Sequence, residues 1–496
     1  MNKLRKLRMG VATIILVFAT LLFLDFTGTI HGWLGWVAKI QFIPALLGLH
    51  MGVVLLFVIL TLIFGRLYCS VICPLGIYQD VMSRFASLRK KKRKFSYSAP
   101  LTWLRWSMVA IFIVAFVAGI GSVVAILDPY SSFGLMVNNI FAPLYKLGNN
   151  LLAYFAERVD SYAFYNVDII IFNLGSLILA IVTMLAIGYL AWRNGRTYCN
   201  TICPLGTVLG LLSRFSIFKI VIDTDKCNGC KKCVRECKAA CIDGDKHKID
   251  YSRCVACFDC IDSCNQGAIS YTKRRKAETP KNDTEIDANR RKMLAISATI
   301  ATTAALKAEE KLVDGGLATI EDKEIPKRNT PIVPAGACSI RNFSEKCTGC
   351  QLCVTVCPNN VLRPATGLKN FLQPEMSYEY GYCRPECNKC SEVCPAGAIE
   401  RVSVEDKSSI QIGHAVWVEK NCVVLTDGVD CGNCARHCPV GAISMVQATD
   451  TERYGNRKIP VVDIERCIGC GACEYNCPSR PFSAIYVEGN SMHRNN

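Results

Sequence analysis

A twelve-residue motif occurs twice in this chain, at an offset of 130 residues. It reads Gly-Arg-Leu-Tyr-Cys-Ser-Val-Ile-Cys-Pro-Leu-Gly at 65–76 and Gly-Arg-Thr-Tyr-Cys-Asn-Thr-Ile-Cys-Pro-Leu-Gly at 195–206. Each copy follows a long apolar segment and is followed by Ser-Arg-Phe at the same distance. We therefore expect two hairpins of like design in a pseudo-symmetric bundle, with the two Cys-x3-Cys-Pro turns able to meet.

The four cysteines of these turns are candidate metal ligands or redox thiols: Cys69, Cys73, Cys199 and Cys203. A simpler interpretation makes them reduced, buried cysteines at helix ends, with the following prolines as helix breakers. The same pattern in both halves favours a shared chemical role.

Four apolar stretches, at 11–26, 44–64, 104–127 and 169–192, predict transmembrane helices, since about 20 residues span the hydrocarbon core. Lysine and arginine gather in the N-terminal tail and after the second and fourth stretches. The positive-inside rule therefore predicts that both ends of this unit and both turns lie on the cytoplasmic side of an inner membrane. The net charge of +16 follows this distribution, and we expect no binding of nucleic acid.

Ionisable residues gather near the opposite face, where His50, Asp25 and Asp128 are candidate proton acceptors for quinol oxidation. The alternative is that they are solvated helix caps.

Two cysteine runs follow the helical unit and predict a pair of [4Fe–4S] clusters, because three closely spaced cysteines bind one cubane and the fourth reaches the neighbouring one. The first predicted ligand set is Cys227, Cys230, Cys233 and Cys264. The second is Cys254, Cys257, Cys260 and Cys237. Zinc is the alternative, although zinc sites rarely use this spacing. Cys241 is interpreted as a small packing residue.

Four further quartets, each closed by proline, predict four more [4Fe–4S] clusters and a total of six. Their members are Cys347, Cys350, Cys353, Cys357, Cys383, Cys387, Cys390, Cys394, Cys422, Cys431, Cys434, Cys438, Cys467, Cys470, Cys473 and Cys477. The connectors are too similar in length to decide whether the motifs pair in order or nest. Cys338 belongs to no quartet.

A basic and mildly apolar segment at 289–308 separates the two cysteine-rich parts. Paired arginines before a weakly apolar run are typical of a twin-arginine export signal, which would place the last unit in the periplasm. The alternatives are an alanine-rich linker helix or a fifth transmembrane helix.

The helical part with its twin Cys-x3-Cys-Pro turns resembles the NapH/NosR-type membrane ferredoxins, and the twin-arginine-like segment with four quartets resembles NapG/MauM-type ferredoxins. Together the resemblances cover nearly the whole chain, as though two subunits were fused. They imply a quinol dehydrogenase module that takes electrons from the membrane quinol pool to a periplasmic reductase or c-type cytochrome. Here the twin-arginine segment is internal, whereas in the family it begins a separate protein.

The sequence thus predicts a multi-domain protein with an α-helical membrane bundle and α+β ferredoxin-like domains. The expected parts are a four-helix membrane domain at 1–216, a two-cluster ferredoxin domain at 217–275, a linker at 276–330 and a four-cluster ferredoxin domain at 331–496. Two other functions stay open: a quinone-independent transmembrane electron conduit, with a further iron–sulfur centre or a redox disulfide at the Cys-x3-Cys-Pro cysteines, and a redox maturation factor for a metalloenzyme.

Overall fold

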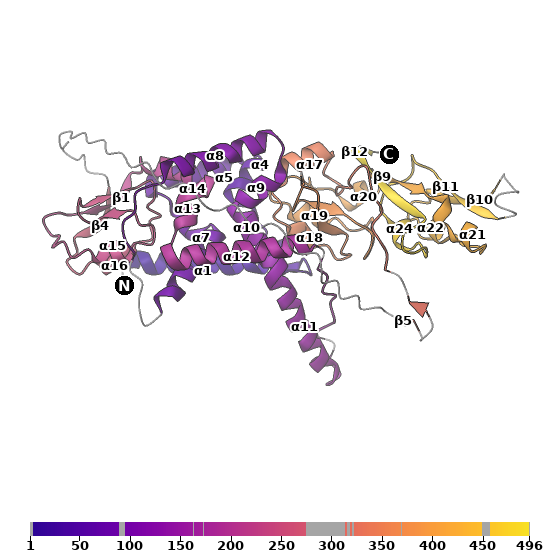
Figure 1. Ribbon diagram of the computed structural model, residues 1–496, viewed down its shortest axis with the longest axis horizontal. Helices are drawn as coiled ribbons and strands as arrows, with labels where there is room; N and C mark the ends of the chain where they lie inside the picture. The colour runs from indigo at the N-terminus through magenta and orange to yellow at the C-terminus, as the bar shows by residue number, and fades with distance from the viewer. Residues whose placement is uncertain are drawn as a thin grey trace, which may run out of the picture.

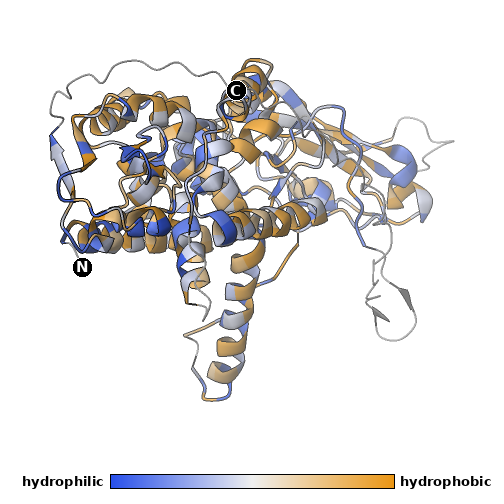
Figure 2. Cartoon of the chain, turned by 60° about the vertical axis from the view of Figure 1, so that its left-hand side comes forward, coloured by the Kyte–Doolittle hydropathy of each residue, from blue (hydrophilic) through white to orange (hydrophobic). Residues whose placement is uncertain are grey.

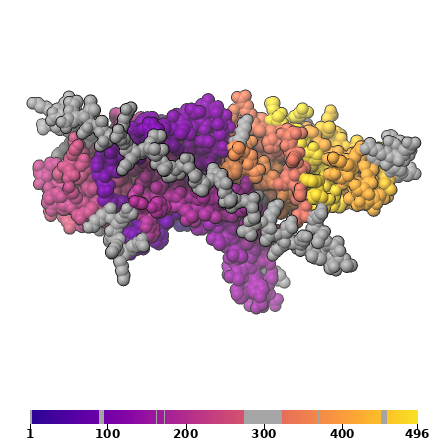
Figure 3. All heavy atoms as spheres, viewed as in Figure 1, coloured from indigo at the N-terminus to yellow at the C-terminus, as the bar shows by residue number. Residues whose placement is uncertain are grey.

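The chain has three parts arranged in a row, a helical unit with a cysteine-rich unit at each end (Figures 1 and 3). The computed structural model describes residues 3–88, 95–161, 163–171, 173–273, 313–314, 318–319, 322–368, 370–448 and 457–495. The twin-arginine-like segment at 289–308 lies outside the described residues, so its predicted roles stay predictions.

The helical unit is built around four apolar helices: α1 (Lys3–Leu24), α5 (Met51–Phe64), α8 (Thr102–Val117) and α12 (Leu174–Asn194). Figure 2 shows that hydrophobic residues predominate along the helices. By length and composition, α1 and α12 qualify as candidate membrane spans, whereas α5 and α8 fall short of the length needed.

Two of the predicted spans are interrupted, which corrects the expectation of continuous helices over 44–64 and 104–127. The first divides into α4 (Phe42–Leu47) and α5, and between them Leu49 has a φ of 55°. The second divides into α8 and α9 (Gly121–Leu127), separated by Gly119 at a φ of 68°. A left-handed residue ends an α-helix, and hydropathy alone does not reveal the position of one.

Short helices cap the end of the bundle that faces residues 322–495. They are α2 (Thr29–Leu34), α3 (Trp36–Lys39), α4, α9, α10 (Pro129–Met136) and the π-helix η1 (Val137–Phe141). The helix α11 (Ala142–Glu157) then leaves the body at a steep angle to α1 and α12 (Figure 1).

The duplicated motif forms a repeated helix–turn–helix at the other end of the bundle. Its elements are α6 (Leu67–Val71) with α7 (Pro74–Ser87), and α13 (Thr197–Thr201) with α14 (Pro204–Ser213). In each copy proline occupies the first turn of the second helix, where its missing N–H costs no hydrogen bond.

The two cysteine-rich units consist of short helices and two-stranded antiparallel sheets. The first unit contains β1 (Phe218–Ile222) paired with β4 (Ile269–Lys273), β2 (Ile242–Asp243) paired with β3 (Lys248–Ile249), α15 (Lys232–Glu236) and α16 (Asp259–Ser263). The sheets of the second unit are β7 (Leu362–Pro364) with β8 (Pro374–Met376), β9 (Ile410–Trp417) with β12 (Ile485–Asn495), and β10 (Ile443–Gln447) with β11 (Lys458–Val462). Its helices are α17 (Ile340–Lys346), α18 (Leu352–Thr355), α19 (Lys389–Val393), α20 (Val404–Lys407), η2 (Glu419–Asn421), α21 (Val423–Thr426), α22 (Asn433–Arg436) and α24 (Ala472–Tyr475). A further pair, β5 (Val313–Asp314) and β6 (Ala318–Thr319), lies before this unit in the chain.

The helices α1 and α12 run from one cysteine-rich unit to the other. At the start of α1, Arg5 pairs with Asp259 of the first unit at 2.7 Å. Just past its end, the backbone carbonyl of Thr27 accepts a hydrogen bond from Lys389 of the second unit at 2.9 Å. The start of α12 touches Pro364, and the backbone N–H of Arg196, just after its end, donates to the carbonyl of Lys238 at 2.9 Å.

The interrupted helices make the same connection. The carbonyl of Phe64, at the end of α5, accepts a hydrogen bond from Tyr271 of the first unit at 2.9 Å. At the other end of the α4–α5 hairpin, Gly48 lies against the carbonyl of Pro395. Arg105 of α8 binds Ser252 at 3.1 Å, and beyond the break Gly121 packs closely against Gln373 of the second unit. Each of the four helical segments therefore links the two units.

Candidate metal centres

The four cysteines of the duplicated turns come together in the core of the helical unit. Cys69, Cys73, Cys199 and Cys203 belong to one buried cluster, and each is only 4% exposed. Cys73 lies within electrostatic reach of the other three thiols. We call this group the cysteine cage. Four soft sulfur ligands in a dry interior suit an iron–sulfur centre.

Two buried arginines cross between the repeats to hold the cage. Arg66, from the first copy, donates to the carbonyl of Cys199 at 3.2 Å and lies 3.8 Å from the sulfur of Cys69. Arg196, from the second copy, donates in turn to the carbonyl of Cys69 at 2.5 Å. Sequence reasoning assigned no role to these residues, although their presence in both copies of the motif was a usable signal.

Glycines in the motif leave space for these crossing contacts. A Cβ on Gly76 would lie 2.3 Å from the carbonyl oxygen of Cys69 and 2.8 Å from Arg196. A Cβ on Gly206 would lie 2.1 Å from the oxygen of Cys199 and 2.9 Å from Arg66. The repeated glycine is therefore a packing requirement of the cage.

The two arginines differ in their charge partners. Arg196 pairs with Asp80 at 2.8 Å, and Asp80 also pairs with Arg8 at 2.9 Å. Arg66 is fully buried, and within the described residues no carboxylate lies within ion-pair distance of it. A buried charge without a counter-charge is costly. Thiolates bound to a cluster would supply that negative charge, so the surroundings fit an anionic centre.

In the first cysteine-rich unit the structure groups the cysteines crosswise. One cavity is lined by Cys227, Cys230, Cys233 and Cys264. Cys237, from the first run, lies instead within electrostatic reach of Cys254, Cys257 and Cys260. Each group offers four thiols from two runs, the arrangement that a pair of cubanes requires.

In the second unit the motifs pair in chain order, which the even connectors had left undecided. The groups are Cys347, Cys350 and Cys353 with Cys394; Cys383, Cys387 and Cys390 with Cys357; Cys422, Cys431 and Cys434 with Cys477; and Cys467, Cys470 and Cys473 with Cys438. The two halves meet where the backbone N–H of Cys383 donates to the carbonyl of Cys470 at 2.9 Å.

Among the described residues these groups contain neither a disulfide nor a single-ion site. All thirty cysteines are free of disulfides. Across the residues that the structure describes, no three His, Cys, Asp or Glu side chains converge on a single ion-sized point. Ligands of a four-iron cubane bind different irons and need not converge in this way.

Burial favours the protonated form of several thiols of the second unit. It raises the pKa of Cys350 to about 12 and that of Cys434 to about 11. For Cys470, burial and the neighbouring Cys467 and Cys383 raise the pKa to about 12, although a backbone N–H opposes them. Because metals bind the thiolate, loading these groups must release protons.

Two cysteines remain outside the groups. The sulfur of Cys241 lies 3.6 Å from that of Cys237, and its thiol lowers the pKa of Cys237 by hydrogen bonding to the thiolate. It thus contacts a candidate ligand, in addition to the packing role expected from sequence. Cys338 is exposed and belongs to no group.

The cysteine cage lies between groups of both units. Arg66, which touches the cage, also donates to the carbonyl of Ser252 at 3.1 Å and lies within electrostatic reach of Cys254. On the other side, Tyr68 and Cys350 both lie within electrostatic reach of Asp128. The cage is therefore flanked by buried groups that lie near candidate ligands of the first unit on one side and of the second unit on the other.

The three candidate proton acceptors have different local surroundings. Asp25 accepts hydrogen bonds from the backbone N–H of Gly28 and from the ring of His31, and Asp128 caps α10 through the N–H groups of Tyr130 and Ser131. His50 is exposed. Among the described residues no hydrogen bond or ion pair joins the three. Their role in quinol chemistry stays a prediction, and Asp25 and Asp128 both serve as helix-end caps.

Comparison with known families adds to this geometry. Residues 46–96 and 174–222, which contain the duplicated turns, match the family described as 4Fe-4S binding domain. Residues 346–398 and 429–480 match the family described as 4Fe-4S dicluster domain. The expectation of several 4Fe–4S clusters and of iron–sulfur electron transfer is thereby confirmed, whereas their number is not.

Several curated proteins are similar to part of the chain. The methylamine utilization ferredoxin-type protein MauM of Methylobacillus flagellatus is 31% identical over 169 residues, which is 33% of this chain and 70% of MauM. The ferredoxin-type protein NapG of Escherichia coli is 30% identical over 155 residues, 29% of this chain and 64% of NapG. The uncharacterized protein MJ0749 of Methanocaldococcus jannaschii is 24% identical over 185 residues, 36% of this chain and 54% of that protein.

Proposed function

Because the chain belongs to the family of ferredoxin-type proteins that includes MauM, we propose that it carries electrons through iron–sulfur clusters from one face of a membrane to the other. The observation that carries this proposal is that each of the four helical segments of the bundle contacts one cysteine-rich unit at one end and the second unit at the other. The cysteine cage lies between the two units.

The proposal includes six [4Fe–4S] clusters, held by the six groups of four cysteines, and a seventh iron–sulfur centre in the cage. The buried Arg66, without a carboxylate partner among the described residues, supports the seventh centre. The family match over both turns supports it independently.

The proposed orientation places the first unit in the cytoplasm and the second outside an inner membrane. Lysines and arginines beside the two turns support this orientation through the positive-inside rule. The segments α5 and α8 are short for a span, and beside their breaks Gly48 and Gly121 lie against Pro395 and Gln373 of the second unit.

We further propose the membrane quinol pool as electron donor and a periplasmic reductase or c-type cytochrome as acceptor. The likeness to the ferredoxin-type protein NapG supports iron–sulfur electron transfer, and a cavity at the junction of the helical unit with the second unit offers a place for the donor.

Electron transfer across a bilayer tests the proposal. The cluster-loaded protein is reconstituted into liposomes that contain ferricyanide, and dithionite is added outside. We expect reduction of the internal ferricyanide, and we expect Cys69→Ser combined with Cys199→Ser to slow it to the rate of protein-free vesicles.

Cys338→Ser is the matched control, because Cys338 is exposed and lies in no group. Spectra of the two outer units verify that the double variant keeps their clusters. Ferricyanide reduction by the double variant as fast as by the wild type would contradict the proposal.

A further inference from the structure

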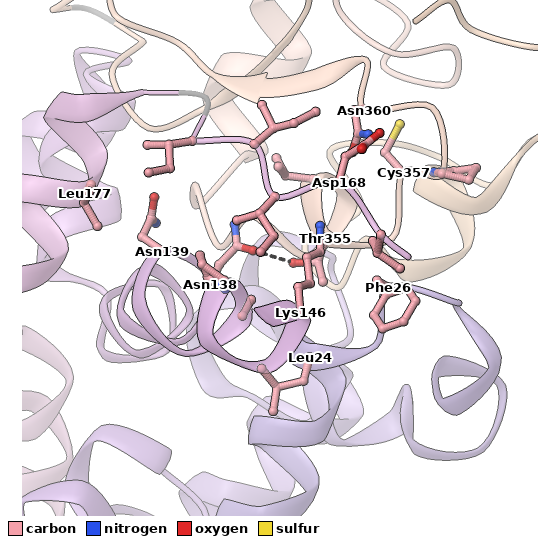
Figure 4. Close-up of a pocket in the computed structure, with 18 of the residues that line it drawn as sticks. Leu24, Phe26, Asn138, Asn139, Lys146, Asp168, Leu177, Thr355, Cys357 and Asn360 are labelled. Atoms are coloured by element: carbon pink, nitrogen blue, oxygen red, sulfur yellow. Dashed lines mark hydrogen bonds between the residues drawn. The ribbon is translucent and has the colours of Figure 1, made fainter. Parts of the chain in front are cut away.

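A cavity of about 280 Å³ lies between the outer end of the helical unit and the second cysteine-rich unit (Figure 4). Its wall includes residues from α12 and β7, the end of α1, the η1–α11 stretch, the extended chain at 165–171, and the end of α18 with the loop that follows it, 354–360. The last of these contributes Cys357, the fourth member of the group formed with Cys383, Cys387 and Cys390. The cavity therefore borders a candidate iron–sulfur centre directly.

Several polar side chains in this wall form hydrogen bonds with one another or with the nearby Gln351. The π-helix η1 directs two consecutive side chains, Asn138 and Asn139, to the same oxygen of Gln351, at 3.0 and 3.1 Å. Thr355 donates to Asn138 at 3.0 Å. These contacts fix the helical unit to the second unit and shape the floor of the cavity.

Two charged side chains in the wall are not occupied in this way. Lys146 and Asp168 both line the cavity and lie within electrostatic reach of each other (Figure 4). Within the part of the chain that the structure describes, neither has a hydrogen-bond partner or an ion-pair contact within 4.0 Å. The rest of the lining includes the apolar Leu24, Ile169 and Leu177. One cation and one solvent-exposed anion in a cavity lined by both polar and apolar side chains suit a small ligand with a polar head.

The helix α11 gives this cavity a position relative to the membrane. Its polar residues face the returning chain, since Asn149 donates to the carbonyl of Tyr165 and Asn150 to that of Val167, both at 2.8 Å. Its apolar residues, such as Leu147 and Leu151, are 58% exposed. Because α11 runs steeply across α1 and α12, it would lie in the interfacial plane of a membrane that those helices cross (Figure 1).

We propose that this cavity binds the head group of a lipid-soluble quinol, whose tail leaves along the apolar surface of α11. This inference rests on the proposed electron-transfer function. A volume of about 280 Å³ admits one quinol ring system. The bordering Cys357 places the ring next to an electron acceptor.

The reaction balances with the groups present. The hydroquinone loses two protons and two electrons and becomes the quinone. Asp168 accepts one proton, and water at the mouth accepts the other. The two electrons would pass one at a time to the iron–sulfur centre that Cys357, Cys383, Cys387 and Cys390 would hold, and Lys146 donates a hydrogen bond to a ring oxygen.

The test follows reduction of the clusters in the loaded protein in lipid nanodiscs, by absorbance and electron paramagnetic resonance, after addition of menadiol or decylubiquinol. We expect Asp168→Asn and Ala142→Trp, which fills the cavity, to slow reduction by both quinols. Reduction by dithionite, which needs no binding site, is expected to stay unchanged. Asp160→Asn and Val461→Trp are matched controls, because both residues are exposed and neither lines the cavity or belongs to α11.

Reduction of both cavity variants by quinol at the wild-type rate would overturn the inference and leave the electron-transfer proposal intact. Failure of quinol to reduce the wild type, while dithionite reduces it and electrons still cross liposomes, would also overturn it and leave the transmembrane role standing. Loss of transfer across liposomes with quinol reduction retained would instead refute the transmembrane proposal alone.

Discussion

At the scale of single residues, the cage combines a repeated motif with one unrepeated charge. Asp80 neutralises Arg196, and the corresponding position in the second copy, at the same offset of 130 residues, is Gly210. A Cβ on Gly210 would lie 2.9 Å from Arg105, so a second cation lies close to this position. Arg66 is therefore left to a partner that is negatively charged only when the cage is loaded.

Because of this asymmetry, we expect the loss of the Arg66 charge to disfavour the loaded cage and to stabilise the protein with an empty cage. Arg66→Met should lower iron content by about four atoms per chain, the content of one cubane, because the variant removes the counter-charge of the centre. In metal-depleted protein the same substitution should raise the thermal midpoint, because it removes an uncompensated buried charge. Iron analysis and thermal unfolding of Arg66→Met and of the exposed control Arg84→Met measure both effects. Equal iron in both variants would contradict the role of Arg66.

Gly76 offers a steric test of the cage. Gly76→Ala places a methyl group 2.3 Å from the Cys69 carbonyl oxygen, and overpacking of this kind costs about 1–3 kcal/mol. We expect a lower thermal midpoint and less iron at the cage. Gly52→Ala, in a helix with no atom within 4 Å of the new methyl, should change neither quantity. An unaltered Gly76→Ala protein would show that the crossing contacts are not required.

At the scale of elements, sequence reasoning located the apolar segments and missed where they break. The break near Leu49 uses a left-handed residue that is not glycine, and the adjacent Gly48, which ends α4, was its signal in the sequence. The break at Gly119 had a glycine as its signal, but glycine within an apolar run is compatible with an unbroken helix. The search for continuous apolar runs did not find α11, because its apolar residues are spaced along one face of a helix.

The placement of α11 at the membrane interface predicts contact with lipid on one side only. A photo-crosslinking residue in place of Leu151, which is 58% exposed, should form adducts with phospholipid in liposomes. The same residue in place of Asn149, which bonds to Tyr165, should crosslink within the chain. Mass spectrometry of the adducts distinguishes the two positions. Absence of a lipid adduct at 151 would place α11 in water or against a protein partner.

At the scale of the whole molecule, the cysteine spacing predicted the ligand groups because cubane ligation is local in sequence. It left the pairing of the last four motifs open, since that pairing depends on how two halves of the second unit fold. The docking of that unit on the far end of the bundle depends on side-chain contacts such as Gln351 with Asn138. Such contacts have no periodic signature. The cavity beside Cys357 arises from the same junction and was equally hidden.

Total iron tests the number of centres in the intact protein. Seven cubanes predict about 28 iron atoms per chain, and six predict about 24. Combining Cys73→Ser with Cys203→Ser should remove the difference and leave the spectra of both outer units unchanged. The wild type and this variant, purified side by side under anaerobic conditions, give the comparison. Identical iron content would mean that the cage holds thiols alone.

The central claim is that the two cysteine-rich units lie on opposite sides of one membrane. Limited proteolysis of right-side-out and inverted membrane vesicles measures this directly, with antibodies against tags in the first unit and at the C-terminus. We predict that protease removes the second unit only in right-side-out vesicles and cleaves the first unit only in inverted vesicles. Cleavage of both units in the same vesicle preparation, with the other preparation resistant, would contradict the account.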